Sequence, residues 1–381
     1  MWLNWSLGVG MRSGLKWIIF TFFTVFVILT GYYASTLVSE YPQTIPTKSP
    51  ANRIVVAGNY AYLACGDGGL EIFNLTNPGS PGLSWNLPIE GYANDMAVEG
   101  DYAYIAAGNS GLAVEDISNP ANLLPPQYLM LNGPVSRLTV AGNYTYVIAG
   151  GNVSICNITD PSNPSVVNET TGIVASAVAV NGTYMYAIDQ TKFMIYNVGD
   201  PTNVLMIVNK TLANAFSNIY LNNYCIYLTN NGSRGGQIYL ANPTSISYNG
   251  IYYGYTANAL AFYQSWMFSV DITGITAYNL TSIQEVSFPP YDAPGNDIAV
   301  TGSRIYVINT NGLEIANVDM SNLDQIPTNY SNLIFYIELF STLSFISLIL
   351  FIVAFIRAKR TNKIEQYKSQ GKKFSEYGWR R

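Results

Sequence analysis

The segment AVEGDYAYIAAGNSGLAVEDISNP, residues 97–120, decides the fold because its first half recurs along the chain. The piece EGDYAYIA starts at Glu99, and related pieces start at Ala57, Ala141, Asn181, Asn222, Tyr263 and Thr301. The second aromatic residues of successive pieces are 38 to 42 residues apart. Self-similarity at a fixed period indicates a repeat architecture, and the period here is that of propeller blades. Seven copies therefore predict seven structural units.

Each unit contains four short segments with strand character. In the second unit these are Asp95–Glu99, Tyr102–Ala106, Leu112–Ile117 and Gln127–Leu131. Tyr, Val, Ile and Thr favour pleated, half-buried surfaces, and Gly100-Asp101 is a typical hairpin turn. One four-stranded unit cannot bury both faces, whereas a closed ring of such units does. The sequence predicts an all-β, seven-bladed β-propeller of four-stranded antiparallel blades over residues 51–319.

The same frame is present in IVVAGNYAYLACGDGGLEIFNLTNP, residues 54–78, and in LTVAGNYTYVIAGGNVSICNITDP, residues 138–161. In these motifs the chain resembles the LVIVD-repeat family. The resemblance covers about residues 51–319 and fades after Asn197. It implies a prokaryotic surface β-propeller, an archaeal-type glycoprotein, whose repeat residues are structural. It implies no catalytic activity.

The seventh repeat has no recognisable fourth strand after Gly312–Val318. We expect residues 37–46, within a linker of residues 35–50, to complete this blade as an outer edge strand, where proline is tolerated. In this arrangement the chain enters and leaves the propeller at one face, the bottom. The opposite face, the top, carries the loops that follow the second and fourth strands of each blade.

Two uncharged or nearly uncharged apolar segments flank the repeats, at residues 17–34 and 333–356. Each is long enough to cross a bilayer as a helix. Basic residues lie on their outer sides, so we expect residues 1–16 and the basic tail 357–381 to be cytoplasmic, with 320–332 a second linker. The propeller would then be extracellular at the cell membrane. The alternative for the first segment is a cleaved signal peptide.

The composition disfavours several functions. The region between the apolar segments holds 7 basic and 20 acidic residues, so it repels phosphate backbones and nucleic acid is not an expected partner. The chain has no His and only three scattered cysteines, which disfavours general-base catalysis, a metal site and a disulfide framework. We expect no catalytic residue and no cofactor.

A polar column starts the first strand of every repeat. Its members are Asn52, Asn94, Ser136, Ser176, Ser217, Asn258 and Asn296. We expect them to bond neighbouring backbone at the top of the channel. At the next position Asp297, Arg53, Asp95 and Arg137 alternate in charge around the ring. They form either an arc of interblade ion pairs or a ligand site at the channel mouth, together with Asn94 and Asn296.

Other candidate sites are on loops. Arg234 lies in the long loop 230–236, where an exposed cation can meet a carboxylate or a glycan. Ten glycosylation sequons lie between the two apolar segments, and only those at Asn152 and Asn231 are expected in top loops. The ten sequons are at Asn74, Asn143, Asn152, Asn157, Asn168, Asn181, Asn209, Asn231, Asn279 and Asn329.

The leading functional hypothesis is therefore a membrane-anchored, non-enzymatic binding or scaffold module at the cell surface. Its expected partners are the lipid bilayer and a surface protein or glycan. The alternatives are a surface hydrolase that acts on glycans or peptides, and an accessory subunit of a membrane complex. Fold alone does not exclude the hydrolase, which would need paired carboxylates in the channel.

Overall fold

The computed structural model describes the repeat region of the chain. The described residues are 43–77, 80–169, 172–223, 225–230, 236–242, 245–252, 257–271, 274–280, 285–287 and 295–317. The predicted membrane segments and both tails lie outside these residues. Among those described, no helix has the length and apolar character needed to cross a membrane.

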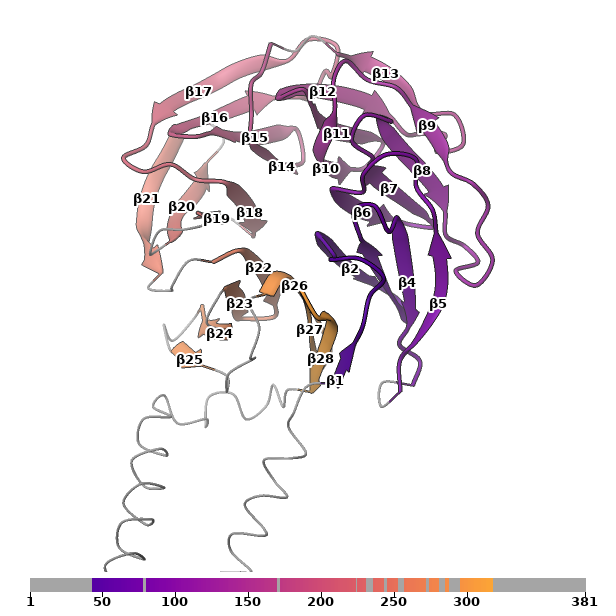
Figure 1. Ribbon diagram of the computed structural model, residues 1–381. Coiled ribbons are helices and arrows are strands. Elements are labelled where there is room, and N and C mark those ends of the chain that lie inside the picture. Colours follow the sequence, from indigo (N-terminus) through magenta and orange to yellow (C-terminus); the bar gives the residue numbers. More distant parts are fainter. Residues whose placement is uncertain are drawn as a thin grey trace, which may run out of the picture. The chain divides into compact units, whose positions relative to one another are not determined.

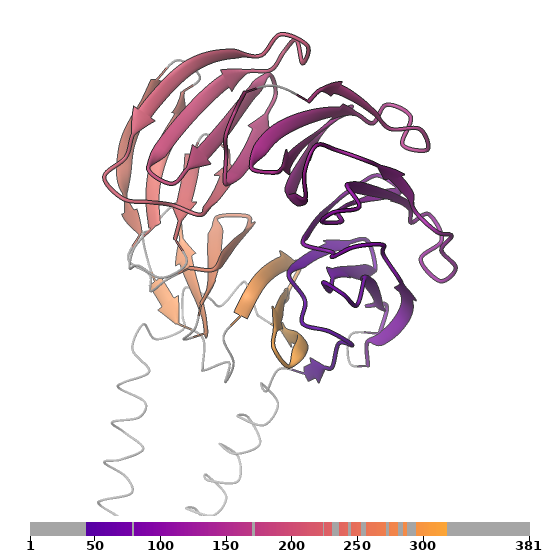
Figure 2. The ribbon, with the colours of Figure 1, turned by 45° about the horizontal axis from the view of Figure 1, so that its top comes forward.

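Seven four-stranded antiparallel sheets surround a central channel, as the sequence predicts (Figures 1 and 2). In the first blade the strands run outward in chain order as β2 (Arg53–Ala57), β3 (Tyr60–Ala64), β4 (Leu70–Asn74) and β5 (Gly82–Leu87). The second blade contains β6 (Asp95–Glu99), β7 (Tyr102–Ala106), β8 (Leu112–Asp116) and β9 (Gln127–Leu129). Its third and fourth strands end one and two residues earlier than expected.

The next four blades repeat this order. The third blade contains β10 (Val135–Ala141), β11 (Tyr144–Ala149), β12 (Asn152–Asn157) and β13 (Ser165–Asn168), and the fourth contains β14 (Ala177–Asn181), β15 (Tyr184–Asp189), β16 (Lys192–Asn197) and β17 (Leu205–Thr211). The fifth blade contains β18 (Asn218–Asn222), β19 (Cys225–Thr229), β20 (Gly236–Asn242) and β21 (Ser245–Tyr252), and the sixth contains β22 (Ala259–Tyr263), β23 (Trp266–Asp271), β24 (Gly274–Asn279) and β25 (Glu285–Ser287). The inner strands line the channel, and the fourth strands lie at the periphery (Figure 1).

The seventh blade closes the ring with strands from both ends of the repeat region. It consists of β26 (Gly295–Thr301), β27 (Arg304–Asn309), β28 (Gly312–Asn317) and, as its outer strand, β1 (Gln43–Ile45). Gln43 pairs with Ile315, so the described chain starts and ends at the same edge of the ring. This edge is the bottom. The outer strand lies within the stretch 37–46 that the sequence singled out, of which residues 37–42 are outside the described part.

The core lies between the blades. Seven clusters of buried apolar side chains are present, and each joins two neighbouring blades. The cluster between blades seven and one, for example, joins Tyr306 and Leu313 to Ile54 and Phe73. Among the described residues, every blade therefore packs its two sheet faces against its two neighbours.

The three cysteines are not paired with one another. Cys65 and Cys156 are buried, and Cys225 is partly buried. Burial raises the pKa of the Cys65 and Cys156 thiols to about 12, so both stay protonated and unreactive at neutral pH.

Candidate functional site

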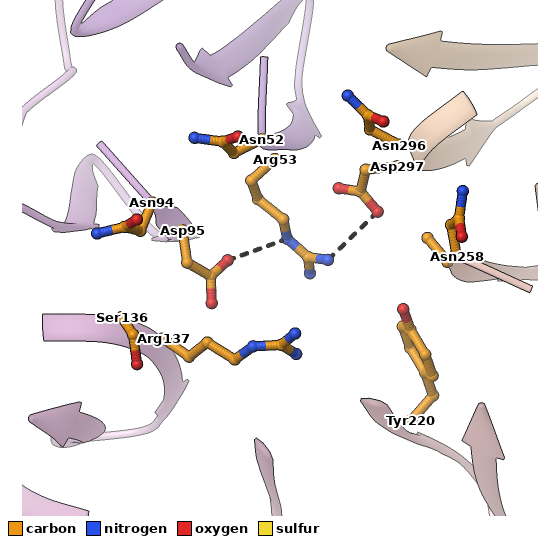
Figure 3. A pocket seen from close by; sticks show the side chains of 11 residues that line it. Asn52, Arg53, Asn94, Asp95, Ser136, Arg137, Tyr220, Asn258, Asn296 and Asp297 are labelled. Carbon is orange, nitrogen blue, oxygen red and sulfur yellow. Dashed lines mark hydrogen bonds and ion pairs between the residues drawn. The ribbon is translucent and has the colours of Figure 1, made fainter. Parts of the chain in front are cut away.

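The four charged residues predicted from the sequence lie together at the top of the channel (Figure 3). Each is among the first three residues of an inner strand, so the ring symmetry brings them to one level. Arg53 lies between two carboxylates. Its Nε is 3.5 Å from Asp95 Oδ1, and its Nη1 is 3.4 Å from Asp297 Oδ1. These pairs join three consecutive blades.

Both carboxylates also bind backbone of the next blade. Asp297 Oδ2 accepts a hydrogen bond from the backbone N–H of Ile54, at 2.9 Å, and Asp95 Oδ2 accepts one from Leu138, at 3.1 Å. Burial raises the pKa of Asp297, an effect that Arg53 opposes. Hydrogen bonds to a charged acceptor contribute about 1.5–3 kcal/mol each. The two acids therefore fasten blade seven to blade one and blade two to blade three.

Arg137 has a different partner from the one that charge alternation suggests. Its Nη1 donates to Asn218 Oδ1 at 2.6 Å, two blades further round the ring. Among the described residues, no carboxylate forms an ion pair with Arg137; the ion pairs of the arc are those of Arg53. The intervening blade has Ala177 at this level, which leaves the long side chain room to pass.

The asparagines of the polar column link consecutive blades. Each donates from Nδ2 to the carbonyl oxygen of the residue that precedes the equivalent column position in the next blade. The pairs are Asn258 with Gly295, Asn296 with Ala51, Asn52 with Ala93 and Asn94 with Val135, at 2.8 to 3.3 Å. The hydroxyls of Ser136 and Ser176 instead donate within their own blades. The column thus makes the backbone contacts expected of it.

A cavity of about 130 Å³ opens at this level. It is lined by Asn52, Arg53, Asn94, Asp95, Ser136, Arg137, Tyr220, Asn258, Ala259, Asn296 and Asp297. Figure 3 shows both guanidinium groups and the Tyr220 hydroxyl pointing into the same space. Burial raises the pKa of Tyr220 to about 12, so its hydroxyl is neutral and keeps its proton at physiological pH. Apart from Ala259, the lining side chains are polar, and most carry a hydrogen-bond donor.

Sequence reasoning overlooked Tyr220 and the role of Asn218. Both are on β18, two residues apart, so they point to the same side of the strand. A signal was present in the alignment of repeats. At the level of Tyr220 the other six blades carry only small residues: Val55, Ala97, Thr139, Ala179, Ala261 and Ala299. A single tyrosine among small residues indicates that blade five places a large side chain in the channel.

The loop candidates are only partly described. Arg234, Asn231 and Asn329 lie outside the described residues. Of the other sequons, Asn143, Asn152, Asn181 and Asn209 are exposed, Asn74, Asn157 and Asn168 are half-buried, and Asn279 is buried. A buried asparagine is not accessible to glycan transfer in the folded protein. Among the described residues, no group of three or more His, Cys, Asp or Glu side chains has the arrangement of a metal site.

The fold and this channel mouth define a seven-bladed β-propeller with a polar site at one end of its axis. The chain carries four LVIVD repeats, at residues 50–87, 90–124, 132–171 and 174–210, which correspond to blades one to four. No curated protein matches the chain.

Two solved structures share the fold at low sequence identity. The computationally designed Ika8 protein is 10% identical, with a TM-score of 0.52, over 73% of this chain and 100% of its own. The Cps50 (Swd1) β-propeller domain of Myceliophteria thermophila is 12% identical, with a TM-score of 0.60, over 73% of this chain and 99% of its own. At such identities the similarity concerns the fold alone.

Proposed function

We propose that this protein is a membrane-anchored, extracellular glycoprotein that acts as a non-enzymatic binding or scaffold module. The observation that carries this proposal is the cavity at the channel mouth, where six of the seven blades contribute polar side chains. Side chains from several rigid strands hold a polar ligand with defined geometry. The repeats by themselves give no ligand, so the cavity is the basis of the proposal.

The ends of the described propeller support the orientation. Gln43 and Asn317 lie at the bottom edge, and the cavity lies at the top. The apolar segments 17–34 and 333–356 connect to this bottom edge along the chain. The cavity is therefore at the opposite end of the propeller axis from the edge at which these segments join the propeller along the chain.

The state of the carboxylates supports a binding role over hydrolysis. Glycoside hydrolysis needs one carboxylate as an acid and a second as a base or nucleophile. Asp95 and Asp297 both accept backbone N–H groups and both pair with Arg53. Carboxylates held in this way are poorly suited to exchange protons with a substrate. Their contacts at the blade junctions indicate a structural role, which is to join neighbouring blades.

The test compares two full-length variants on arrays of surface glycans and envelope proteins. We expect Arg137→Gln to lose binding while it stays folded, with a smaller loss of stability than Asp297→Asn, because Arg137 has a hydrogen bond to Asn218 but no ion pair among the described residues. We expect Asp297→Asn to lower the free energy of unfolding by about 1–3 kcal/mol. Protease added to intact cells should cut the propeller and spare an epitope placed on the C-terminal tail. Array binding that survives Arg137→Gln, or a tail cut from outside, would contradict the proposal.

A further inference from the structure

The cavity exposes its cations more than its acids. The Arg53 side chain is 38% exposed, whereas Asp95 is 18% exposed and Asp297 is 4% exposed. The oxygens of the two acids accept hydrogen bonds from the backbone N–H groups of Ile54, Met96 and Leu138 and also pair with Arg53. A ligand that enters the channel mouth therefore meets guanidinium groups first, although the formal charges of the arc cancel.

Arg137 is prepared to bind an anion. A guanidinium has five N–H donors. In Arg137 one nitrogen, Nη1, donates a hydrogen bond to the neutral amide oxygen of Asn218. This contact orients the planar group without neutralising it. Arg53 is held differently, between the carboxylates of Asp95 and Asp297, which balance its charge, and its guanidinium faces the same space (Figure 3). Two oriented guanidinium groups are the donor set that recognises a planar carboxylate.

The four asparagines of the polar column provide hydrogen-bond acceptors at the cavity. Asn52, Asn94, Asn258 and Asn296 each use Nδ2 for a bond to the next blade. Within the described residues, no donor is assigned to their side-chain carbonyl oxygens, and all four asparagines line the cavity. Amide oxygens arranged around the mouth can accept hydrogen bonds from several hydroxyl groups at once.

Resting on the binding role proposed above, we propose that the cavity binds a sugar acid, a ligand with one carboxylate beside several hydroxyl groups. The carboxylate is bound between Arg53 and Arg137 and receives a third hydrogen bond from Tyr220, and the sugar hydroxyls donate to the asparagine oxygens. A neutral sugar would leave Arg137 without a charged partner among the described residues. A phosphate carries more negative charge and is repelled more strongly by Asp95 and Asp297, because Coulomb repulsion grows with the ligand's charge.

Calorimetric titration of the full-length protein with four probes tests this proposal. The probes are glucuronate, glucose, acetate and glucose 6-phosphate. We expect saturable binding of glucuronate and at least about tenfold weaker binding of each other probe, since each lacks the hydroxyls or the carboxylate. Acetate or glucose 6-phosphate binding as tightly as glucuronate would overturn the proposal, as would the absence of saturable glucuronate binding.

Two variants assign the binding to the cavity. Arg137→Gln should weaken glucuronate at least about tenfold, and Tyr220→Phe should weaken it by a smaller factor while the ring stays in place. Lys192→Gln is the matched control, because it removes an exposed positive charge outside the cavity. Thermal melts of all three identify any loss of folding. If Arg137→Gln does not fold, Tyr220→Phe alone decides, and unchanged affinity there would overturn the proposal.

The source of the sugar acid is resolved by a second titration, with a short oligouronate. Tighter binding than glucuronate assigns the site to the uronate of an acidic polysaccharide, and equal or weaker binding assigns it to a free sugar acid. The outcome also separates this inference from the proposed function. If an array probe binds in an Arg137-dependent way and no uronate binds, the sugar-acid inference is wrong and the proposed binding function stands. No Arg137-dependent binding of any probe ends both.

Discussion

At the residue scale, the same side-chain type has different roles in different blades. Asp297 and Asp95 bond to the next blade, while Glu71, Glu115 and Glu314 are buried in third strands. Each of these three glutamates has one carboxylate oxygen without an assigned hydrogen-bond partner among the described residues. A buried carboxylate favours its protonated form, because burial penalises the charged form. Burial raises the pKa of Glu71 and of Glu115, which makes the stability of the propeller sensitive to pH.

Glu115 is the clearest case. It is 2% exposed, and burial raises its pKa to about 7, with a hydrogen bond from the Leu124 backbone opposing and nearby Asp116 adding to the shift. The folded state therefore binds this proton more tightly than the unfolded state. The stability that Glu115 contributes is present below its unfolded pKa of about 4.5 and is lost as the pH rises through about 7.

We predict that Glu115→Gln reduces the dependence of the free energy of unfolding on pH, because the amide has the shape of the carboxyl group but no charge. At pH 8 the variant should be more stable than the wild type by on the order of 2–3 kcal/mol, and at pH 4 the two should be similar. Urea unfolding from pH 4 to 8 measures the effect. Glu99→Gln, at an exposed position, is the control. Superimposable profiles for the wild type and Glu115→Gln would contradict the prediction.

At the element scale, the closure of the ring depends on a three-residue strand. Within the described residues, β1 pairs with β28 over Gln43 to Ile45. The approach of the two strands is close, because a Cβ at Gly312 would overlap the carbonyl oxygen of Ile45. The equivalent glycines of blades one and two, Gly69 and Gly111, approach their fourth strands in the same way. A glycine before the third strand thus lets the outer strand reach the blade.

We predict that Gly312→Ala weakens the closure. Its φ is +133°, which L-residues rarely adopt, and the new methyl group pushes β1 away. The expected loss in the free energy of unfolding is about 2–4 kcal/mol. Gly302→Ala is the matched control in the same blade, because its φ is +58° but nothing lies within 4 Å of a Cβ there. It should cost only about 1 kcal/mol.

Limited trypsin digestion provides a second measurement for this closure. Lys48 follows β1 and is held by hydrogen bonds to Glu71 and Asn86. If β1 separates from β28 in Gly312→Ala, cleavage after Lys48 should become faster than in Gly302→Ala. Equal losses of stability and equal cleavage rates in the two variants would show that the contact with Ile45 does not hold the ring closed.

At the scale of the whole molecule, the propeller is a closed cycle of interfaces. Every blade shares one buried cluster with each neighbour, and the cycle includes blades five to seven, outside the four LVIVD repeats. Opening one interface exposes apolar surface on two blades. It also breaks the closed ring, which holds the other interfaces together. The ring is therefore expected to unfold as one cooperative unit.

We predict that Phe268→Ala in blade six and Ile105→Ala in blade two shift the same single transition. Both side chains are fully buried, and such truncations cost about 3–5 and 2–5 kcal/mol, respectively. The denaturant dependence of the free energy should stay unchanged, since the surface exposed on unfolding is the same. Two separate transitions in Phe268→Ala would show that the blades outside the LVIVD repeats form an independent unit.

The sequence by itself determined the number of blades, their strand order and the origin of the closing strand. These features depend on the repeat period, on alternation within strands and on a missing element at one end, all of which are readable along the chain. It also placed Arg53, Asp95, Arg137 and Asp297 at one level, because a ring repeats each strand position. The degraded repeats of blades five to seven kept this register through residues such as Phe268 and Tyr306.

Only the tertiary structure decided which of these groups meet. Arg137 bonds to Asn218, 81 residues away, because Ala177 leaves space that the long side chain crosses. Asp95 and Asp297 bond to backbone N–H groups of the next blade in addition to pairing with Arg53, so Arg137 is the cation that keeps no ion pair among the described residues. Side-chain reach, burial and competition for hydrogen bonds across a channel set these contacts. They depend on distances in space, which residue spacing along the chain does not contain.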